Sequence, residues 1–238
     1  MTSSPALRSA LVTGASSGIG RAIALGLASA GARVIAAGRD AGALRRLADE
    51  APGIHPMAGD LRDGGFVADL TQQAADVDLL VNNAGTLKHA PFLDSSPAEW
   101  EAVFGINVLA LMAVTQPIAR AMAARGHGQI VLLSSLLARR VAPYTTVYAA
   151  SKHAVAAIAQ GLRAELGPRG VRVLEVAPGL VRTNIMRDVA STEVQGSYET
   201  KRFPWLTPEH VAGAVLHAVS APATSCYDLI EVRPHGQF

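Results

Sequence analysis

Residues 9–20 of the chain read SALVTGASSGIG, and this stretch decides the fold. Its first five residues form a short apolar run, which predicts a buried strand, and a glycine-rich turn follows directly. The next residues predict a helix to about Ala30, where Gly31 would end it. Glycines allow a tight turn and a close approach to a pyrophosphate, and a helix N-terminus offers free N–H groups to that anion. The stretch therefore predicts the front half of a dinucleotide site, although its glycine spacing is not G-x-G-x-x-G.

Strand-like and helix-like segments alternate along the rest of the chain. This alternation predicts an α/β fold with a doubly wound parallel sheet, the Rossmann fold. We expect a single domain over residues 1–238, because no linker or abrupt change of composition divides the chain. Further strands are expected at residues 32–37, 54–58, 78–81, 129–133, 171–176 and 228–232. Helices are expected at residues 41–50, 97–124 with a kink at Pro117, 148–166, and from Thr207 onward.

Composition and charge exclude several classes of function. The formal charge is only +2, and the arginine pairs at 45–46 and 139–140 are isolated, so no basic face for nucleic acid is expected. Cys226 is the only cysteine and the histidines are scattered, so neither an intrachain disulfide nor a metal site is expected. The first residues lack the apolar core of a secretory signal, and the apolar run 103–114 is too short to span a bilayer. These features predict a cytoplasmic protein with no membrane partner.

The loop after the second strand bears on the choice of cofactor. An acid at this place would bind the ribose 2′-hydroxyl of NAD, whereas an arginine would bind the 2′-phosphate of NADP. Both types are present, as Arg39 and Asp40. Asp40 stands one step too late for the ribose and is expected to cap the helix 41–50, which leaves Arg39 for a phosphate. NADP(H) is therefore favoured and NAD(H) stays open. After the third strand, Asp60 and Leu61 are expected beside the adenine, and Asp60 is also a candidate cap of the next helix, a role compatible with the first.

Tyr148 and Lys152 lie four residues apart in an Ala-rich helical run, so both side chains can face one site. A nearby cation favours the phenolate and lowers the pKa of a tyrosine, which makes it a better proton donor and acceptor near neutral pH. Taken alone, the pair also fits a half-buried ring beside a solvated amine. Three other polar groups follow or interrupt apolar segments: Asn83 and Ser135 stand at strand ends, and Asn107 is the only amide in a very apolar helical stretch.

Taken together, these motifs resemble the short-chain dehydrogenase/reductase family over nearly the whole chain. The resemblance rests on the glycine turn, on Asn82-Asn83-Ala84-Gly85 and Pro178-Gly179 after two strands, and on a tetrad in family order and spacing. The tetrad residues, implied to be catalytic, are Asn107, Ser135, Tyr148 and Lys152. The residues implied to bind the cofactor are Gly14, Ser16, Ser17, Gly18, Ile19, Gly20, Arg39, Asp60, Leu61, Asn83, Ala84, Gly85, Tyr148, Lys152, Pro178, Gly179, Val181 and Thr183. Many NADP-using relatives carry a basic residue where this chain has Ser17, whereas Arg39 matches their 2′-phosphate ligand.

The resemblance implies an oxidoreductase that moves hydride between a nicotinamide and a ketone or secondary alcohol. In this scheme Ser135 donates a hydrogen bond to the carbonyl, Tyr148 transfers the proton, Lys152 also binds the ribose, and Asn107 holds a water. The ending Asp228–Pro234 is similar to the subgroup acting on 3-hydroxy acids, serine-like compounds and ketones, and to clavulanate-pathway reductases. A homo-oligomer, dimer or tetramer, is also implied. The alternative is a regulator or scaffold that keeps the nucleotide-binding fold without turnover.

The expected substrate is a small carbonyl or alcohol compound whose identity the sequence leaves open. Residues 181–206 have little periodicity and mix aromatic with polar residues, which predicts a lid over it. Arg139 and Arg182 are each either a partner for a substrate carboxylate or a surface arginine.

Overall fold

A computed structural model of the chain describes residues 8–183, 203–222 and 224–237. The described residues form one seven-stranded sheet, parallel throughout, in the order β3-β2-β1-β4-β5-β6-β7. This order reverses direction between β1 and β4, which confirms the expected doubly wound α/β fold. The strands are β1 (Ser9–Thr13), β2 (Arg33–Gly38), β3 (Ile54–Ala58), β4 (Leu79–Asn82), β5 (Gly128–Leu133), β6 (Val171–Pro178) and β7 (Leu229–Val232).

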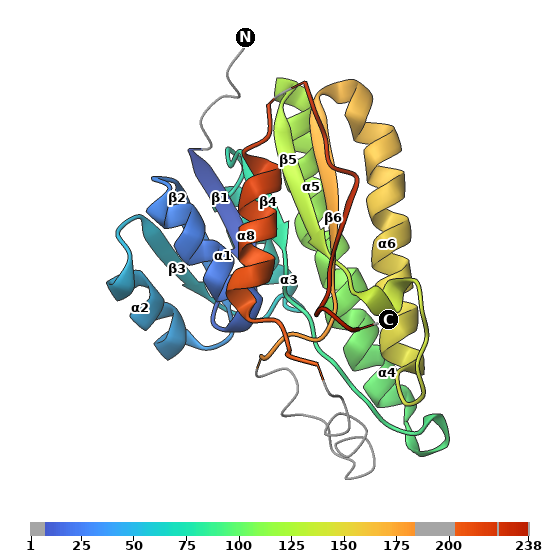
Figure 1. Ribbon diagram of the computed structural model, residues 1–238. Helices are drawn as coiled ribbons and strands as arrows, with labels where there is room; N and C mark the ends of the chain where they lie inside the picture. Colours follow the sequence, from blue (N-terminus) through green and yellow to red (C-terminus); the bar gives the residue numbers. More distant parts are fainter. Residues whose placement is uncertain (1–7, 184–202, 223, 238) are drawn as a thin grey trace.

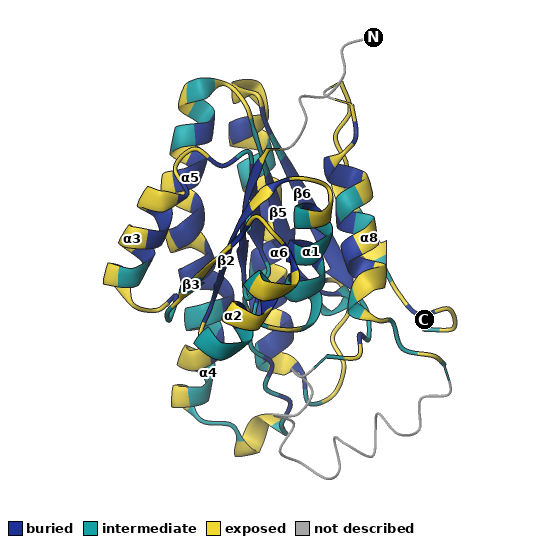
Figure 2. Ribbon diagram, turned by 90° about the vertical axis from the view of Figure 1, so that its left-hand side faces the viewer, coloured by how far each residue is buried: buried dark blue, intermediate teal, exposed yellow. Residues whose placement is uncertain are grey.

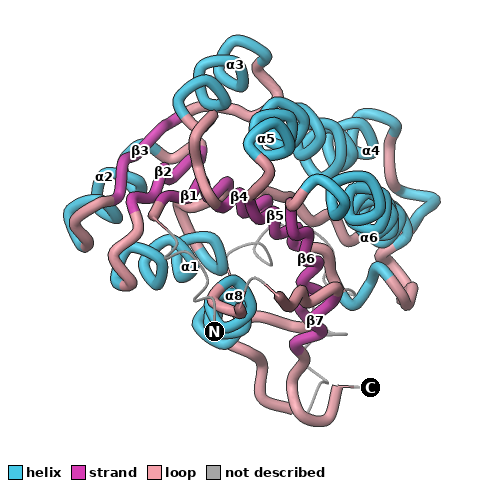
Figure 3. The backbone as a smooth tube through the Cα atoms, turned by 90° about the horizontal axis from the view of Figure 1, so that it is seen from above, coloured by secondary structure: helices cyan, strands magenta, loops and turns pink. Residues whose placement is uncertain are grey.

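Helices cover both faces of the sheet (Figures 1 and 3). One face carries α1 (Gly18–Ser29), α2 (Ala41–Glu50) and α8 (Pro208–Val219). The other face carries α3 (Gly64–Gln73), α5 (Leu111–Arg125) and α6 (Thr146–Leu166), with α4 (Pro97–Phe104) beside α6. Short 3-10 helices are η1 (Phe92–Asp94), η3 (Leu136–Ala138) and η4 (Gly167–Arg169), and η2 (Gly105–Ala110) is a π-helix.

The strands are apolar on both sides because helices bury both faces of the sheet. In β1, Ala10 and Val12 join the core under α1 and α8, whereas Leu11 joins the core under α3, α5 and α6. All five residues of β1 are buried, whereas the edge strand β3 is largely exposed (Figure 2) and the other edge strand, β7, alternates between exposed and half-buried residues. The first predicted strand is therefore near the centre of the sheet, where its glycine turn can reach the neighbouring strands.

The long helix expected at residues 97–124 is interrupted. The π-helix η2 separates α4 from α5 and contains Asn107, while Pro117 lies inside α5. The change from α-helix to π-helix around the buried amide was not predicted, and the expected kink at Pro117 stays a prediction. A π-turn within a helix often accompanies a functional residue.

Together, α4, η2 and α5 (Pro97–Arg125) are the one helical stretch of the described chain long and apolar enough to cross a bilayer, and its most apolar window has a mean hydropathy of 1.7. Half of its most apolar window is buried in this fold, as in a core helix. Leu109 and Met112 remain exposed on it, at 59% and 40%.

The carboxyl ends of the strands lie at the lower edge of the sheet in Figure 1. Parallel sheets bind ligands at this edge, next to the point where the strand order reverses. The two described ends of the predicted lid are joined there, since Val181 pairs with Leu206 and Arg182 N donates to Leu206 O at 2.8 Å. The middle of the predicted lid, residues 184–202, lies outside the described residues.

Candidate active site

The glycine turn after β1 is tied to the end of β4 by Asn83. The Asn83 side-chain Nδ2 donates to Thr13 O at 3.0 Å and to Gly14 O at 3.1 Å. The Thr13 hydroxyl accepts from the backbone N–H groups of Asn83 and Ala84, both at 3.1 Å. Gly14 has a positive φ of 66°, and a Cβ there would stand 2.8 Å from the Ala84 Cα. The close approach of these two loops therefore depends on glycine.

Gly20 is the tightest position of the turn, and we expect Gly20→Ala to destabilise the protein. A Cβ at Gly20 would come closer than 3.0 Å to Asn83 Nδ2 and to Gly14 O. Inserting a carbon into a filled site costs about 1–3 kcal/mol, and here it would also disturb the Asn83 hydrogen bonds. Urea unfolding monitored by circular dichroism measures the change.

Gly161→Ala provides the matched control, because Gly161 is an exposed α6 residue with nothing within 4 Å of an added Cβ. Alanine should stabilise that helix by about 0.5–1 kcal/mol. An unchanged free energy of unfolding for Gly20→Ala would contradict the assigned packing.

The N-terminus of α1 faces the predicted cofactor edge. Ser17 is the N-cap, is exposed and makes no side-chain capping bond. Gly18 has a φ of 55°, and a Cβ there would stand 3.1 Å from Thr183 Cγ2, so these two predicted cofactor residues are neighbours. Ser16 lies against Gly38, with its Oγ 3.2 Å from a Cβ built there. The side chain of Val181 is buried in the core and that of Ile19 packs against it, so a contact of either residue with the cofactor would involve its backbone or the exposed part of its side chain.

Arg39 follows β2 directly and is exposed, with no ion pair to any other described residue. Asp40 caps α2, since its Oδ1 accepts from Ala43 N at 2.9 Å. Asp60 does not cap the next helix, as one expectation had it, because α3 begins at Gly64 with Asp63 as N-cap. The Asp60 carboxylate binds the backbone and guanidinium of Arg62 instead, and these bonds lower its pKa to about 2. Leu61, the other predicted adenine contact, is buried in the core.

Tyr148 and Lys152 share one face of α6, and both are buried. The Lys152 Nζ lies 5.8 Å from the centroid of the Tyr148 ring. It donates to Leu133 O at 2.8 Å, at the end of β5. Burial lowers the pKa of Lys152 to about 8, so its ammonium is still largely protonated at neutral pH. The amine and the phenol therefore stand together beside the strand that carries Ser135.

Asn107 in η2 links the loop after β4 to α6. Its Oδ1 accepts from Thr86 N at 2.8 Å, and its Nδ2 donates to Thr86 O and to Ser151 Oγ, both at 3.0 Å. A Cβ built at Gly85 would stand 3.1 Å from Asn107 Oδ1 and 3.7 Å from Lys152 Nζ. Because residue 85 is glycine, no side chain is placed beside the amide and the amine at this point.

Ser135 follows β5 and begins η3. Its Oγ accepts from Leu137 N at 3.1 Å, and the residue is 9% exposed. The helix η3 packs against α6. Pro178 is buried at the end of β6, and a Cβ built at Gly179 would stand 3.1 Å from Leu136 Cδ1. The loops that follow β5 and β6 therefore meet at the edge where Lys152 binds.

Three residues near this site were not predicted from the sequence. Ser151 accepts a hydrogen bond from Asn107, and the only feature of the sequence that could have indicated this role is its position next to Lys152. Gln237 accepts from Leu180 N at 3.1 Å, a contact 57 residues distant in sequence that no local pattern reveals. His89 is 3% exposed, with its ring edge-on to Tyr148 at 6.0 Å, and burial lowers its pKa to about 4, so it is neutral at pH 7.

Arg139 is not placed to receive a substrate carboxylate. It forms two hydrogen bonds to Glu175, both at 2.7 Å, so its guanidinium is already paired with a carboxylate of the protein. The expectation of a substrate carboxylate partner is therefore wrong. Arg139 does lie near the surface, as the other expectation had it, but it is bound to a buried glutamate. Arg182 is exposed. In the described part of the chain, no three His, Cys, Asp or Glu side chains are arranged to hold a metal ion.

Comparison with known proteins identifies the family. Residues 8–194 match the family model described as short chain dehydrogenase. An uncharacterised short-chain type dehydrogenase/reductase of Sinorhizobium fredii is 38% identical over 231 residues, which cover 96% of this chain and 92% of that protein. A carbonyl reductase of Sus scrofa, named for NADPH, is 36% identical over 91% of this chain and 90% of its own. The solved structure of a serine dehydrogenase complexed with NADP+, in its closed form, superposes with a TM-score of 0.88 at 28% identity and covers 94% of each chain. The chain therefore belongs to the short-chain dehydrogenase family of oxidoreductases.

Proposed function

We propose that this protein is an NADP(H)-dependent oxidoreductase that interconverts a ketone and a secondary alcohol, with Tyr148 as general acid and base. One observation carries the proposal. The buried ammonium of Lys152 lies 5.8 Å from the Tyr148 ring and is bound to the strand end that leads to Ser135. A phenol beside a buried cation, at the ligand-binding edge of a doubly wound sheet, suits proton transfer to an oxygen.

The described residues fit a dinucleotide at the glycine turn. Gly14 and Gly18 adopt positive φ, and the Ser17 side chain leaves the first turn of α1 without a cap, which suits a pyrophosphate there. Arg39 would bind the 2′-phosphate. Ser16, which lies against the preceding residue Gly38, would stand near the same phosphate. Asp60 and Leu61 would border the adenine, and Lys152 would bind the nicotinamide ribose. The segments that would line the nicotinamide are Asn83–Gly85, Pro178–Gly179, Val181 and Thr183.

The bound nicotinamide would supply the hydride. Ser135 would donate a hydrogen bond to the substrate oxygen and so orient the carbonyl. Tyr148 would give its proton to that oxygen during reduction and remove it during oxidation. Lys152 would stabilise the phenolate that reduction leaves behind.

Asn107 would help return the proton to Tyr148. Its side chain is already bonded to Thr86 and Ser151, so it holds the loop after β4 and α6 together. A water beside Gly85, near the Asn107 amide and the Lys152 amine, would connect the amine to solvent.

Support for NADP(H) over NAD(H) comes from two sources. Arg39 is exposed at the end of β2, while Asp40 is occupied as a helix cap. The Sus scrofa relative is named for NADPH, and the serine dehydrogenase structure holds NADP+.

A turnover assay tests the proposed function. The purified protein is mixed with NADPH or NADH and a panel of ketones, ketoses, 1,2-diketones and 3-oxo acids, and loss of nicotinamide absorbance is followed. We expect steady turnover with at least one carbonyl compound and a higher kcat/KM for NADPH than for NADH. Tight NADPH binding with no turnover on any panel member would instead favour a regulator or scaffold of the same fold.

We further propose a cytoplasmic homo-oligomer, a dimer or a tetramer. The exposed Leu109 on η2 and Met112 on the adjoining α5 support it, because neighbouring large apolar side chains at the surface suit a contact with a second copy. The lone cysteine, Cys226, is exposed and free, which suits a reducing compartment. Light scattering of the purified protein would refute an oligomer if it gave the monomer mass of 24.7 kDa. Cell fractionation tests the location.

A further inference from the structure

A carboxylate that the proposed chemistry does not use lies directly beneath the site. Glu175 sits on β6, where it pairs in register with Leu132 of β5. The residue is 1% exposed. A buried carboxylate is costly unless it is paired and hydrogen-bonded, so its partners indicate why the fold holds it there.

Glu175 binds both ends of the segment that contains Ser135. At the start of the segment, the Ser134 hydroxyl donates to Glu175 Oε1 at 2.5 Å. At its end, Arg139 donates to Oε1 and to Oε2, both at 2.7 Å. Ser134 N also donates to Val176 O at 2.8 Å, which fixes the start of the segment on β6 a second time. One side chain thus closes residues 134–139 into a loop.

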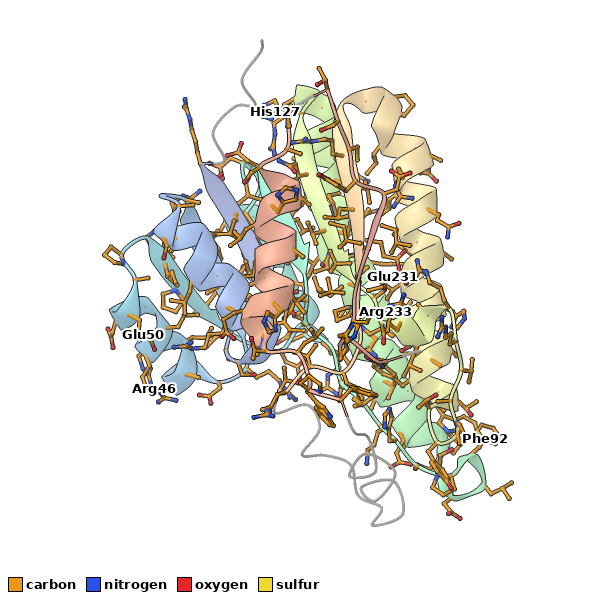
Figure 4. The ribbon with its side chains drawn as sticks, in the orientation of Figure 1. Arg46, Glu50, Phe92, His127, Glu231 and Arg233 are labelled. Atoms are coloured by element: carbon orange, nitrogen blue, oxygen red, sulfur yellow. The ribbon has the colours of Figure 1, made fainter. Side chains whose placement is uncertain are left out.

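Arg139 completes this clamp at the edge of the sheet. Its side chain is 29% exposed, and its Nε lies 3.6 Å from Glu231 on β7, which Figure 4 shows beside β6. The hydrogen bond to Glu175 raises the pKa of Arg139, so the guanidinium stays charged. A bidentate arginine–carboxylate pair fixes orientation as well as distance, and lysine cannot reproduce it.

Ser135 has little freedom inside the closed loop. Its Oγ accepts from Leu137 N, and Arg139 N donates to Leu136 O at 3.1 Å, so the segment is a short, hydrogen-bonded turn. We propose that the clamp formed by Glu175, Ser134 and Arg139 positions the Ser135 hydroxyl for the substrate oxygen. Arg139 and Glu175 are then positioning residues. This inference rests on the proposed function, since it gives Ser135 a substrate to orient.

A double-mutant cycle between Arg139 and Ser135 tests the proposal. Arg139→Gln, Ser135→Ala and the double variant are assayed as full-length protein with NADPH and the best carbonyl substrate of the panel. Displacing a substrate-orienting group by about 1 Å can lower the rate 100-fold, so we expect Arg139→Gln to lower kcat about 10- to 100-fold. In the Ser135→Ala background the same change should lower kcat by less than about threefold, because effects of residues that act as a unit do not multiply. The dissociation constant for NADPH should stay within about threefold in all variants, since the clamp touches no proposed cofactor group.

Separate outcomes distinguish the possible failures. If Arg139→Gln lowers kcat by the same factor with and without Ser135, the clamp does not act through that serine and the inference is overturned. If Ser135→Ala alone keeps full activity, the proposed role of Ser135 fails and the inference falls with it. Arg33→Gln serves as the control, because it breaks an exposed ion pair with Asp76 and should leave kcat unchanged.

Arg139→Lys covers the case in which Arg139→Gln does not fold. It keeps the charge but loses the two-pronged contact, so we expect a smaller loss in kcat of about 3- to 10-fold. That loss should also vanish when Ser135 is alanine. A loss that persists in that background would contradict the proposal.

Discussion

Replacing Tyr148 with phenylalanine should lower kcat for carbonyl reduction by about 10²- to 10⁴-fold, the range that a positioned general acid contributes. The change removes one oxygen and leaves the ring, so the packing of α6 should survive. Tyr148 is buried, its ring lies edge-on to His89 at 6.0 Å, and Lys152 stands beside it. Circular dichroism and NADPH titration would establish that the variant is folded and still binds the cofactor.

Tyr227→Phe is the matched control, because Tyr227 is 39% exposed and bonds to His217 on α8, away from the predicted site. Its kcat should match that of the unmodified protein. Full carbonyl reduction by a Tyr148→Phe protein that binds NADPH would exclude the proposed acid–base role.

Replacing Arg39 with alanine should weaken NADPH binding by about 10- to 100-fold, since a hydrogen bond to a charged group contributes about 1.5–3 kcal/mol. NADH has no 2′-phosphate, so its dissociation constant should change by less than about threefold. The change should leave the fold intact, because Arg39 is exposed and forms no ion pair within the described residues. Fluorescence titration with each cofactor measures both constants.

Arg169→Ala controls for loss of a surface charge, because Arg169 lies in η4, just before β6 begins, at the opposite end of the sheet. It should change neither constant. Equal weakening of NADPH and NADH by Arg39→Ala would argue against a 2′-phosphate site at this residue.

Local chemistry accounts for the parts of the fold that were predictable. The first strand, its glycine turn and α1 are read from apolar runs and turn residues that act within a few positions. Asp40 caps α2 through a hydrogen bond to Ala43, only three positions further along the sequence. Tyr148 and Lys152 share a face of α6 because helical geometry alone puts them there.

Contacts between distant segments account for the parts that were not. Asp60 was a candidate N-cap of α3, but its carboxylate is hydrogen-bonded to Arg62, and Asp63 caps α3 instead. The sequence around Arg139 fits a surface arginine, and only the fold shows that Glu175 on β6, 36 residues away, binds it. Asn107, in the π-helix, is bonded to Thr86 and Ser151, which lie 21 and 44 residues away in the sequence. Neither composition nor spacing encodes such pairings.

The central claim is that hydride passes from a nicotinamide to a carbonyl carbon while Tyr148 supplies the proton. The most direct test is to load the protein with NADPH deuterated at the transferring C4 position, add the carbonyl substrate, and analyse the alcohol by mass spectrometry. The account predicts one deuterium on the carbinol carbon with the unmodified protein, and almost no alcohol over the same time with cofactor-loaded Tyr148→Phe. Unlabelled alcohol, or labelled alcohol formed equally fast by Tyr148→Phe, would contradict it.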